Sequence, residues 1–529
     1  MENKKLTGAA FIVMSSIVVS RITGFLREML VPNMIGVNEA GDAYNLAFRV
    51  TGLMYDLLVG GAIAAALIPV LSGYIAKKDE ENGWKAVSTF INVVIVSMSL
   101  VCLTGIFFAP QFMSLVAVGF RNESQRQLTI ELTRILFPSV SFLMLAGLVN
   151  GILNSYHRFA AAAYGPSLYN LGSALSILLL SKSKWGVRSV AYGVLASALF
   201  YFLFQLAFAL KNLKYYRFSF QLRHKGFVRL IRLAIPSMIS SAIVQINVII
   251  TGSFATLFKE GSVTALNMAD RTWQLPYGVF AQGMGIAMLP SLSSNHAVGE
   301  IEEYKSTLMK GIKTVLFLTV PSGVGFIVLR EPVIRTIFKF AKSFSEESVS
   351  VSANVLMFFS IALLSQSIVT IMNRAFYAAN DTATPLWIGL STIVVNITLS
   401  RIFYETTNLG VSAMALSYSL ASSLNAFLLL LLLDRKMGGI HIDKLVRFFL
   451  KIIPASVIMG ASLFLIDGII SVNDSSKLIQ FISLSIEMLF GVGIYFIIVM
   501  LMRVEEAYYI RDVIADKFRS IIRNKRNRT

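Results

Sequence analysis

Cysteine, histidine and charge are scarce in this 529-residue chain, and each scarcity excludes a class of protein. The single cysteine, Cys102, excludes intramolecular disulfides and argues against a thiolate metal cluster. The four histidines are scattered without the spacing of metal ligands, so we expect them in loops. Charged residues make up 14% of the chain, whereas soluble proteins contain about 25%. The sequence therefore does not predict a soluble domain, a disulfide scaffold or a metal site.

Apolar residues are abundant instead, at 55% of the chain with a mean hydropathy of +0.69. No cleavage site follows the first apolar segment, so we expect it to be retained as a membrane span. Spans of about 20 apolar residues are long enough to cross a bilayer. The sequence predicts an all-α polytopic membrane protein with fourteen transmembrane helices, near residues 8–35, 43–74, 86–109, 130–154, 165–181, 187–210, 234–257, 263–292, 311–329, 349–379, 384–403, 409–433, 446–467 and 478–502.

The formal net charge of +18 lies mostly in the short loops between these spans. About 30 of the 47 lysines and arginines fall on the side that holds both termini. Cytoplasmic loops carry such an excess, so we expect both termini in the cytoplasm and no nucleic-acid partner. The largest basic loop, residues 211–232, is either an amphipathic helix on the inner leaflet or a plain linker.

Four arginines interrupt the apolar segments or lie at their edges: Arg21, Arg27, Arg49 and Arg271. An arginine near the bilayer centre costs about 2.5–3.5 kcal/mol on insertion scales, so such residues usually face a wet cavity or a partner. Guanidinium groups match phosphate oxygens two at a time. The pattern predicts a transporter for a phosphorylated substrate.

Acids near two of these arginines leave an alternative open, in which each arginine pairs with an acid instead of binding substrate. Arg49 pairs with Asp42 or Asp56 in that alternative, and Arg271 pairs with Asp270. Such pairs would neutralise the arginines and leave no anion site.

The chain also repeats itself with a period near 220 residues. NSYHRFAAAAYGP at 154–166 corresponds to NRAFYAANDTATP at 373–385, and Arg49 corresponds nearly to Arg271. Two like halves are the usual construction of an alternating-access carrier. We expect two pseudo-symmetric six-helix lobes, a pair of additional spans and a cationic cytoplasmic tail, at residues 1–215, 216–435, 436–503 and 504–529.

Glycines and one acid are candidates for gating. Gly24 interrupts the first span, and Gly60 and Gly61 interrupt the second, so both helices are expected to bend where they line a cavity. Asp42 opens the second span, where it is either a helix cap or a gate acid that pairs with an arginine.

Polar residues in the later spans suggest two further roles. Gln274 lies one helical turn from Arg271 and is expected to orient it. Gln245, Asn247 and Asn373 either coordinate a coupling cation or form ordinary interhelical hydrogen bonds.

The motifs SRITGFLRE, GDAYNLAFRV and GGAIAAALIPVLSGY within Ser20–Tyr74 resemble the N-terminal motifs of the MurJ/MviN family. These are bacterial lipid II flippases of the multidrug/oligosaccharidyl-lipid/polysaccharide exporter superfamily. Residues 269–293 and 376–385 are similar to the family's motifs in spans eight and ten. The resemblance covers roughly residues 8–435 in order.

This resemblance implies a transporter rather than an enzyme, which moves undecaprenyl-diphosphate-linked disaccharide-pentapeptide to the outer leaflet of the bacterial cytoplasmic membrane. Peptidoglycan biosynthesis, cell shape, membrane lipids and contact with the cell-wall synthesis machinery belong to that implication. The family's essential arginines fall on Arg21, Arg27 and Arg271, its acid on Asp42 and its further basic position on Arg49.

The chain departs from the family pattern at three places. Tyr55 stands where the family usually has arginine, Gly60-Gly61 where it has Glu-Gly, and Gln274 where it often has an acid. A flippase for another polyprenyl-diphosphate glycan is therefore the first alternative.

Two other classes of membrane protein fit the sequence less well than a flippase. A cation-coupled multidrug exporter of the same superfamily would need more buried acids than arginines, and a membrane glycosyltransferase would need a catalytic carboxylate in a large outer loop. The sequence contains no GxxxxGK[ST] run for ATP. We expect no cofactor, and a drive from a coupling cation, Na⁺ or H⁺, or from the membrane potential.

Overall fold

The computed structural model describes residues 2–55, 66–120, 122–156, 158–340, 344–470, 476–508 and 511–512, and its regular structure there is helical. Nine helices in these ranges are long and apolar enough to cross a membrane. Thirteen of the fourteen predicted segments fall on a described helix or on a run of helices, and the segment 43–74 falls on α2 and α3 except for residues 56–65, which lie outside the described part. The expectation of an all-α polytopic membrane protein is therefore confirmed.

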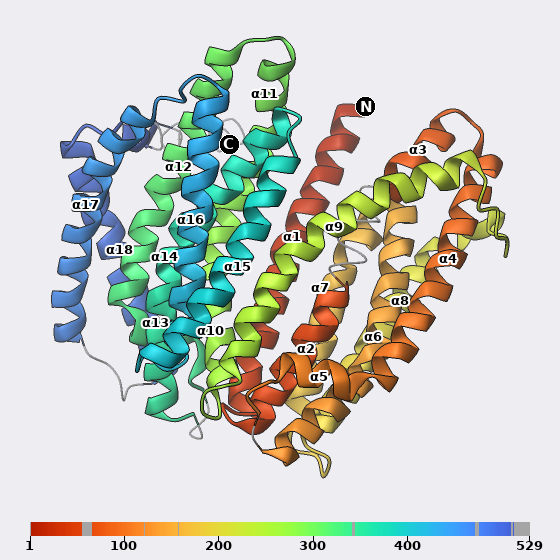
Figure 1. Ribbon diagram of the computed structural model, residues 1–529, viewed down its shortest axis with the longest axis horizontal. Helices are drawn as coiled ribbons and strands as arrows, with labels where there is room; N and C mark the ends of the chain where they lie inside the picture. Colours follow the sequence, from red (N-terminus) through yellow and green to blue (C-terminus); the bar gives the residue numbers. More distant parts are fainter. Residues whose placement is uncertain are drawn as a thin grey trace, which may run out of the picture. The chain divides into compact units, whose positions relative to one another are not determined.

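The chain divides into two compact units, of which unit 1 contains Met1–Met268 and Ala341–Ser348. Helices α1 and α7 pack side by side in this unit, and α6 packs against α2 and α8 (Figure 1). Its helices are α1 (Glu2–Met34), α2 (Glu39–Tyr55), α3 (Ile68–Ala76), α4 (Glu80–Phe107), α5 (Ala109–Val116), α6 (Glu123–Ser155), α7 (Phe159–Leu180), α8 (Val187–Ala209), η3 (Leu210–Tyr215), α9 (Lys225–Ala255) and the start of α10 (Ser262–Pro276).

Unit 2 contains Ala269–Phe340 and Val349–Thr529. It holds the rest of α10, and then η4 (Tyr277–Gln282), α11 (Gly283–Ala297), α12 (Ile301–Val328), α13 (Arg330–Phe338), α14 (Glu346–Ala378), α15 (Ala383–Thr406), α16 (Ser412–Lys436), α17 (Ile442–Ile470) and α18 (Lys477–Leu501). The short helices α5 and α13 lie outside the predicted spans.

Helix α9 packs within unit 1, although it follows the predicted lobe boundary at residues 215 and 216. It contacts α2, α3, α4 and α5. Leu230 of α9 belongs to the same buried cluster as Leu67, Trp84 of α4 and Met144 of α6. The predicted lobes describe a repeat in the sequence and stay a prediction, as does the tail, of which residues 513–529 lie outside the described part.

The basic loop before α9 is extended over residues 216–221 rather than an amphipathic helix. Side chains of α4 supply its hydrogen bonds: Ser88 accepts from the Arg217 amide at 3.1 Å, and Asn92 donates to the Ser219 carbonyl at 2.9 Å. Backbone groups that are satisfied in this way need no helical partners. The exposed rings of Phe218 and Phe220 meet edge to face.

Helix α10, whose second half lies in unit 2, is joined to α11 by six residues of π-helix, η4, rather than by a loop. Pro276 ends α10 immediately before it and lacks the N–H that would continue the α-helical ladder. Single π turns inside helices occur often at functional positions. This irregular turn lies one to two turns from Arg271 and Gln274, so it sets the direction of the residues that follow them.

The connection between α14 and α15 is fastened to the end of α16 by Asp381. Its carboxylate accepts hydrogen bonds from the Thr384 amide at 3.0 Å, the Thr384 hydroxyl at 2.8 Å and Lys436 Nζ at 2.6 Å. Burial opposes ionisation of this group, but the bonds from Lys436 and Thr384 outweigh burial and lower the pKa of Asp381 to about 2. The ionised carboxylate therefore stabilises the folded protein.

Asp381→Asn is expected to lower the free energy of unfolding at neutral pH by about 1–2 kcal/mol, as the loss of a cap does. A depressed pKa gives stabilisation above the ordinary value of 3.8, which is lost as the pH falls towards about 2. In detergent, Asp381→Asn should therefore melt at a lower temperature than the unmutated protein at pH 7. The difference between the two melting temperatures should disappear in this acid range. Asp443→Asn, which removes only an exposed pair with Arg447 at 3.7 Å, is the control. Equal losses in the two variants would contradict the assignment.

Candidate functional site

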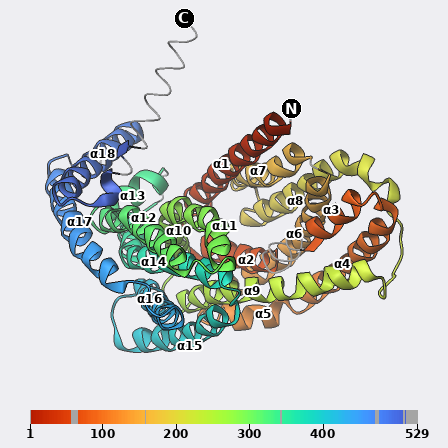
Figure 2. The same cartoon turned by 90° about the horizontal axis from the view of Figure 1, so that it is seen from above.

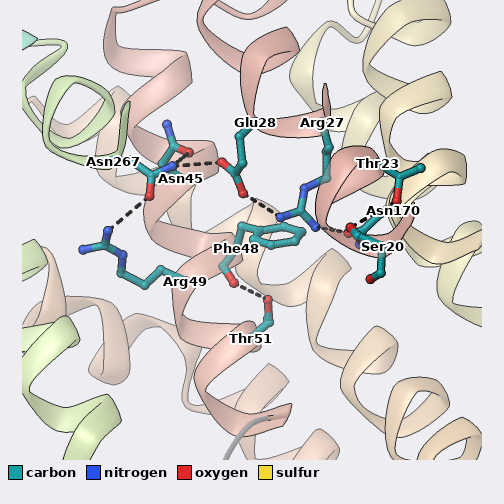
Figure 3. Close-up of polar contacts among 10 residues, drawn as sticks. All are labelled: Ser20, Thr23, Arg27, Glu28, Asn45, Phe48, Arg49, Thr51, Asn170 and Asn267. Carbon is teal, nitrogen blue, oxygen red and sulfur yellow. Dashed lines mark hydrogen bonds and ion pairs between the residues drawn. The ribbon is translucent and has the colours of Figure 1, made fainter. Parts of the chain in front are cut away.

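Arg27 lies buried on α1, about two turns before the end of this helix, with 9% of its surface exposed. Its Nη2 donates to Glu28 Oε1 at 2.6 Å, and its Nη1 donates to Asn170 Oδ1 at 3.1 Å (Figure 3). The guanidinium carbon also lies 4.4 Å from the centre of the Phe48 ring, a cation–π distance. The buried arginine is therefore paired with a carboxylate and held in one orientation by three neighbours.

Gly24 allows α7 to approach α1 at this point. A Cβ atom on Gly24 would lie 3.3 Å from Asn170 Nδ2, so a larger residue would press on the amide. Asn170 uses this space to donate to the Ser20 carbonyl at 3.4 Å while it accepts from Arg27. The structure thus gives Gly24 a packing role beside Arg27, and its predicted gating role stays a prediction.

Asn267 of α10 connects this arginine to a second one. Its Nδ2 donates to Glu28 Oε2 and to Asn45 Oδ1, both at 3.1 Å, while its Oδ1 accepts from Arg49 Nη2 at 3.2 Å. Figure 3 shows the side chains from α1, α2 and α10 pointing toward one another. We call Arg27, Glu28, Asn45, Arg49 and Asn267 the buried polar network.

Asp42 fastens the start of α10 to α2. Its carboxylate accepts from the Gly261 amide, the Thr264 amide and the Thr264 hydroxyl, each at 2.8 Å, and 1% of its surface is exposed. Asn45 Nδ2 donates to the same hydroxyl at 3.0 Å. Of the two predicted roles for Asp42, capping is observed, but the helix that it caps is α10 and not its own. Its predicted gating role stays a prediction.

Contacts between α2 and α10 join corresponding positions of the sequence repeat. Asp42 contacts Thr264 and Asn45 contacts Asn267, and both pairs are 222 residues apart. Arg49 and Arg271 have the same separation in the sequence. Within unit 1, α2 and α10 therefore contact each other through residues at equivalent positions of the predicted repeat.

Arg49 donates hydrogen bonds to two amide oxygens, one of a side chain and one of the backbone. Besides Asn267, its Nη1 donates to the Val248 carbonyl of α9 at 3.3 Å. Gly252 makes this approach feasible, because a Cβ there would lie 2.7 Å from Arg49 Nη1. Asp42, one candidate partner for Arg49 in the alternative, is occupied by α10, and the other, Asp56, lies outside the described residues.

The remaining predicted phosphate ligands are less enclosed. Arg21 is exposed on α1, two turns from the network. Arg271 and Gln274 belong to unit 2, where both are half-buried on α10. Asp270, the predicted alternative partner of Arg271, accepts a hydrogen bond from Trp273 Nε1 at 3.1 Å.

The predicted cation ligands and glycine hinges are only partly described. Asn247 is half-buried on α9 and Asn373 is half-buried on α14, while the side chain of Gln245 and all of Gly60 and Gly61 lie outside the described residues. Within the described part, no group of three or more His, Cys, Asp or Glu side chains is placed to hold a metal ion. The coupling-cation site stays a prediction.

Residues 31–502 match the family model for the lipid II flippase MurJ. The chain belongs to the MurJ family. The family resemblance stated from the sequence is thereby confirmed, and the chain is placed among membrane transporters rather than enzymes.

Curated members of the MurJ family match over most of their length. The lipid II flippase MurJ of Burkholderia cenocepacia is 28% identical over 83% of this chain and 86% of its own length. The probable lipid II flippase MurJ of Rhizobium tropici is 30% identical over 83% of both chains.

Solved structures show the same fold. A lipid II flippase MurJ in an inward closed conformation matches with a TM-score of 0.78 and 24% identity, over 95% of this chain and all of the other. A multidrug resistance MATE transporter matches with a TM-score of 0.69 and 17% identity, over 81% of this chain and 98% of the other. At these identities the likeness concerns the fold.

Sequence reasoning missed most of the residues that surround Arg27 and Arg49 in this MurJ family member. Glu28, Asn170 and Asn267 carry no motif that marks them as partners. A signal did exist for Asn45 and Asn267, because each precedes the repeated arginine by four residues. Residues four apart share one helix face, which places each asparagine beside its arginine.

Proposed function

We propose that this chain moves lipid II from the inner to the outer leaflet of the bacterial cytoplasmic membrane. The match of residues 31–502 to the MurJ family is the observation that carries the proposal. Both termini lie in the cytoplasm in this proposal, because the loops on their side hold most of the lysines and arginines.

The diphosphate of the lipid is held by arginines, Arg21, Arg27 and Arg271, with Arg49 and Gln274 supporting them. The best-defined member of this set is Arg27, whose Nη2 donates to one oxygen of the Glu28 carboxylate while its Nη1 donates to Asn170. A phosphate group presents oxygens with the same spacing and charge. Glu28 therefore occupies the place that a phosphate would take.

Substrate binding then exchanges one anion for another at Arg27. Leaving a buried charge without a partner costs several kcal/mol. A buried arginine that binds substrate therefore needs another counter-ion while no substrate is bound. Glu28 serves as that counter-ion, and Asn267 holds its second oxygen. The departing carboxylate loosens the contact between α1 and α10 as the diphosphate arrives.

Alternating access requires a contact that opens and closes, and the bonds from Asp42 to the start of α10 supply it. They fasten the beginning of α10 to α2, and α10 continues past Met268 into unit 2. Release of this cap frees α10 to move, and the coupling to Asn45 and Asn267 connects that release to Arg27. The energy comes from a Na⁺ or H⁺ gradient or from the membrane potential, at about 2.3 kcal/mol per charge per 100 mV.

Depletion of the resident lipid II flippase in a bacterial host, followed by expression of this chain, tests the proposal. The unmutated chain is expected to restore growth, and Arg21→Ala, Arg27→Ala and Arg271→Ala are expected not to. Arg126→Ala, which removes an exposed arginine 3.9 Å from Glu123, is the matched control and should restore growth.

Two outcomes would contradict the proposal in different ways. If all three alanine variants are present in the membrane and restore growth, the arginine-held diphosphate is wrong. If the unmutated chain reaches the membrane but fails to restore growth, and instead binds another polyprenyl-diphosphate glycan, the substrate is wrong while the site stands.

A further inference from the structure

Two acidic side chains in the spans of unit 2 are not used by the proposed function: Asp467 on α17 and Glu487 on α18. Glu487 lies ten residues after Lys477, where α18 begins, about 15 Å along the helix. This places it half-way across the apolar part of α18. A charged carboxylate at such a depth is costly and usually marks a functional position.

The two carboxyl groups lie at the same level of an antiparallel helix pair. Helices α17 and α18 pack together at the edge of unit 2 (Figures 1 and 2). They approach closely at Gly491, where a Cβ would lie 3.0 Å from two carbons of Leu463. Asp467 is one turn after Leu463 in α17, and Glu487 is one turn before Gly491 in α18. Because the two helices run in opposite directions, both carboxyl groups lie one turn from this contact, on the same side of it. Asp467 accordingly interacts electrostatically with Glu487.

Glu487 is buried and only half satisfied. Its exposed fraction is 3%, and Ser483 Oγ donates to its Oε1 at 3.2 Å. Its second oxygen, Oε2, is buried without a hydrogen-bond partner among the described residues. A buried carboxylate oxygen needs a donor or a cation, so this atom marks the place of a ligand.

The charged groups on the elements packed against α18 do not neutralise the pair. Helix α13 carries Glu331, which interacts electrostatically with Asp467, and Arg330, which donates to the Ile327 carbonyl at 2.8 Å. Lys477 donates to the Arg335 carbonyl at 3.0 Å and to Gln480 at 2.8 Å. Helix α12 has no ionisable residue from residue 314 to its end at 328. Among the described residues, the charged groups that interact with the two carboxyls are therefore other acids.

We infer that Asp467 and Glu487 together bind one monovalent cation between α17 and α18. Two neighbouring carboxylates in an apolar environment cannot both stay ionised, so they share a proton or hold a metal cation. A shared proton would place a hydrogen on Glu487 Oε2. A sodium ion would take its oxygen ligands from both carboxyl groups and the Ser483 hydroxyl. The ligand class is the same in either case, a single positive charge bound by carboxyl oxygens.

Dicyclohexylcarbodiimide labelling of the purified full-length protein tests the site, because this reagent reacts with protonated carboxyls in apolar surroundings. Peptide mass spectrometry is expected to find the label on Glu487, with labelling that falls as the pH rises. Asp467→Asn removes the neighbouring charge and should move the midpoint of that fall to lower pH. Sodium chloride against choline chloride at fixed pH distinguishes the two cations, since only a bound Na⁺ would protect the carboxyl.

Infrared spectroscopy provides the second measurement, in case the reagent does not reach the pair. A protonated carboxyl band, or a band shifted by Na⁺, should disappear in Glu487→Gln and persist in Ser485→Ala, which removes an exposed hydroxyl from the same helix. The inference is wrong if neither the label nor the band depends on pH or Na⁺, or if Asp467→Asn leaves the midpoint unchanged. Neither readout requires transport, so the outcome is separate from that of the complementation experiment.

Discussion

Arg27→Lys is expected to abolish growth complementation even though it retains the positive charge. The guanidinium of Arg27 contacts Glu28 at 2.6 Å, Asn170 at 3.1 Å and the ring of Phe48 at 4.4 Å. An ammonium group is a compact point charge and cannot make these three contacts or bind a phosphate through a fork. Loss of one such charged hydrogen-bond pair costs about 3 kcal/mol, which corresponds to about a 100-fold lower transport rate.

The control for this substitution is Arg188→Lys. Arg188 also pairs with an acid at 2.6 Å, Glu131, but both side chains are about half exposed. Exposed pairs of this kind contribute about 0–1 kcal/mol, so this variant should transport at the normal rate. Transport would be measured in vesicles with a fluorescent polyprenyl-diphosphate lipid. If Arg27→Lys retains more than about half of the normal rate, charge alone suffices and the bidentate role is wrong.

Glu28→Gln tests whether Glu28 competes with the substrate for Arg27, because the substitution leaves Arg27 itself unchanged. Glutamine keeps the shape of the glutamate and its bond to Asn267, but it no longer neutralises the guanidinium. Inorganic pyrophosphate should therefore bind more tightly to this variant than to the unmutated protein. Weaker or unchanged binding, measured by calorimetry in detergent, would show that Glu28 does not compete with the substrate.

The helices and the arginine positions could be predicted because both depend on local sequence. Length and hydropathy indicate where the described helices lie, although α9 begins at Lys225 rather than at the predicted residue 234. An arginine inside an apolar run is visible by itself. The partners of those arginines depend on tertiary packing. Asn170 is 143 residues from Arg27, and Glu28, although adjacent, points about 100° away on an ideal helix.

Asp42 shows the same limit from the other direction. Its position at the start of α2 suggested a cap for that helix, since acids favour helix N-termini. A local rule could assign it only to its own helix, whereas the structure assigns it to α10, 219–222 residues later. The repeat in the sequence contained the missing information, because Thr264 stands where Asp42 stands in the other copy.

Asp42→Ala is expected to cause the largest loss of stability among single substitutions at the site. Three hydrogen-bond donors converge on this buried carboxylate, the Gly261 amide, the Thr264 amide and the Thr264 hydroxyl. Each donor left buried without a partner costs about 1–3 kcal/mol, so the free energy of unfolding should fall by at least about 3 kcal/mol. The start of α10 would then separate from α2, and growth complementation should fail.

Asp42→Asn distinguishes the proposed gate from a purely structural cap. The amide keeps the size of the side chain and one accepting oxygen, so this variant should fold with an intermediate melting temperature. It should nevertheless fail to transport. The new NH₂ group repels one of the two backbone amides, of Gly261 and Thr264, that donate to Asp42, so the contact between α2 and the start of α10 no longer closes. Glu39→Ala, which removes an exposed bond to Asn122 at 2.6 Å in the same turn of α2, is the control. Normal transport by a stable Asp42→Asn variant would leave Asp42 as a cap and remove it from the mechanism.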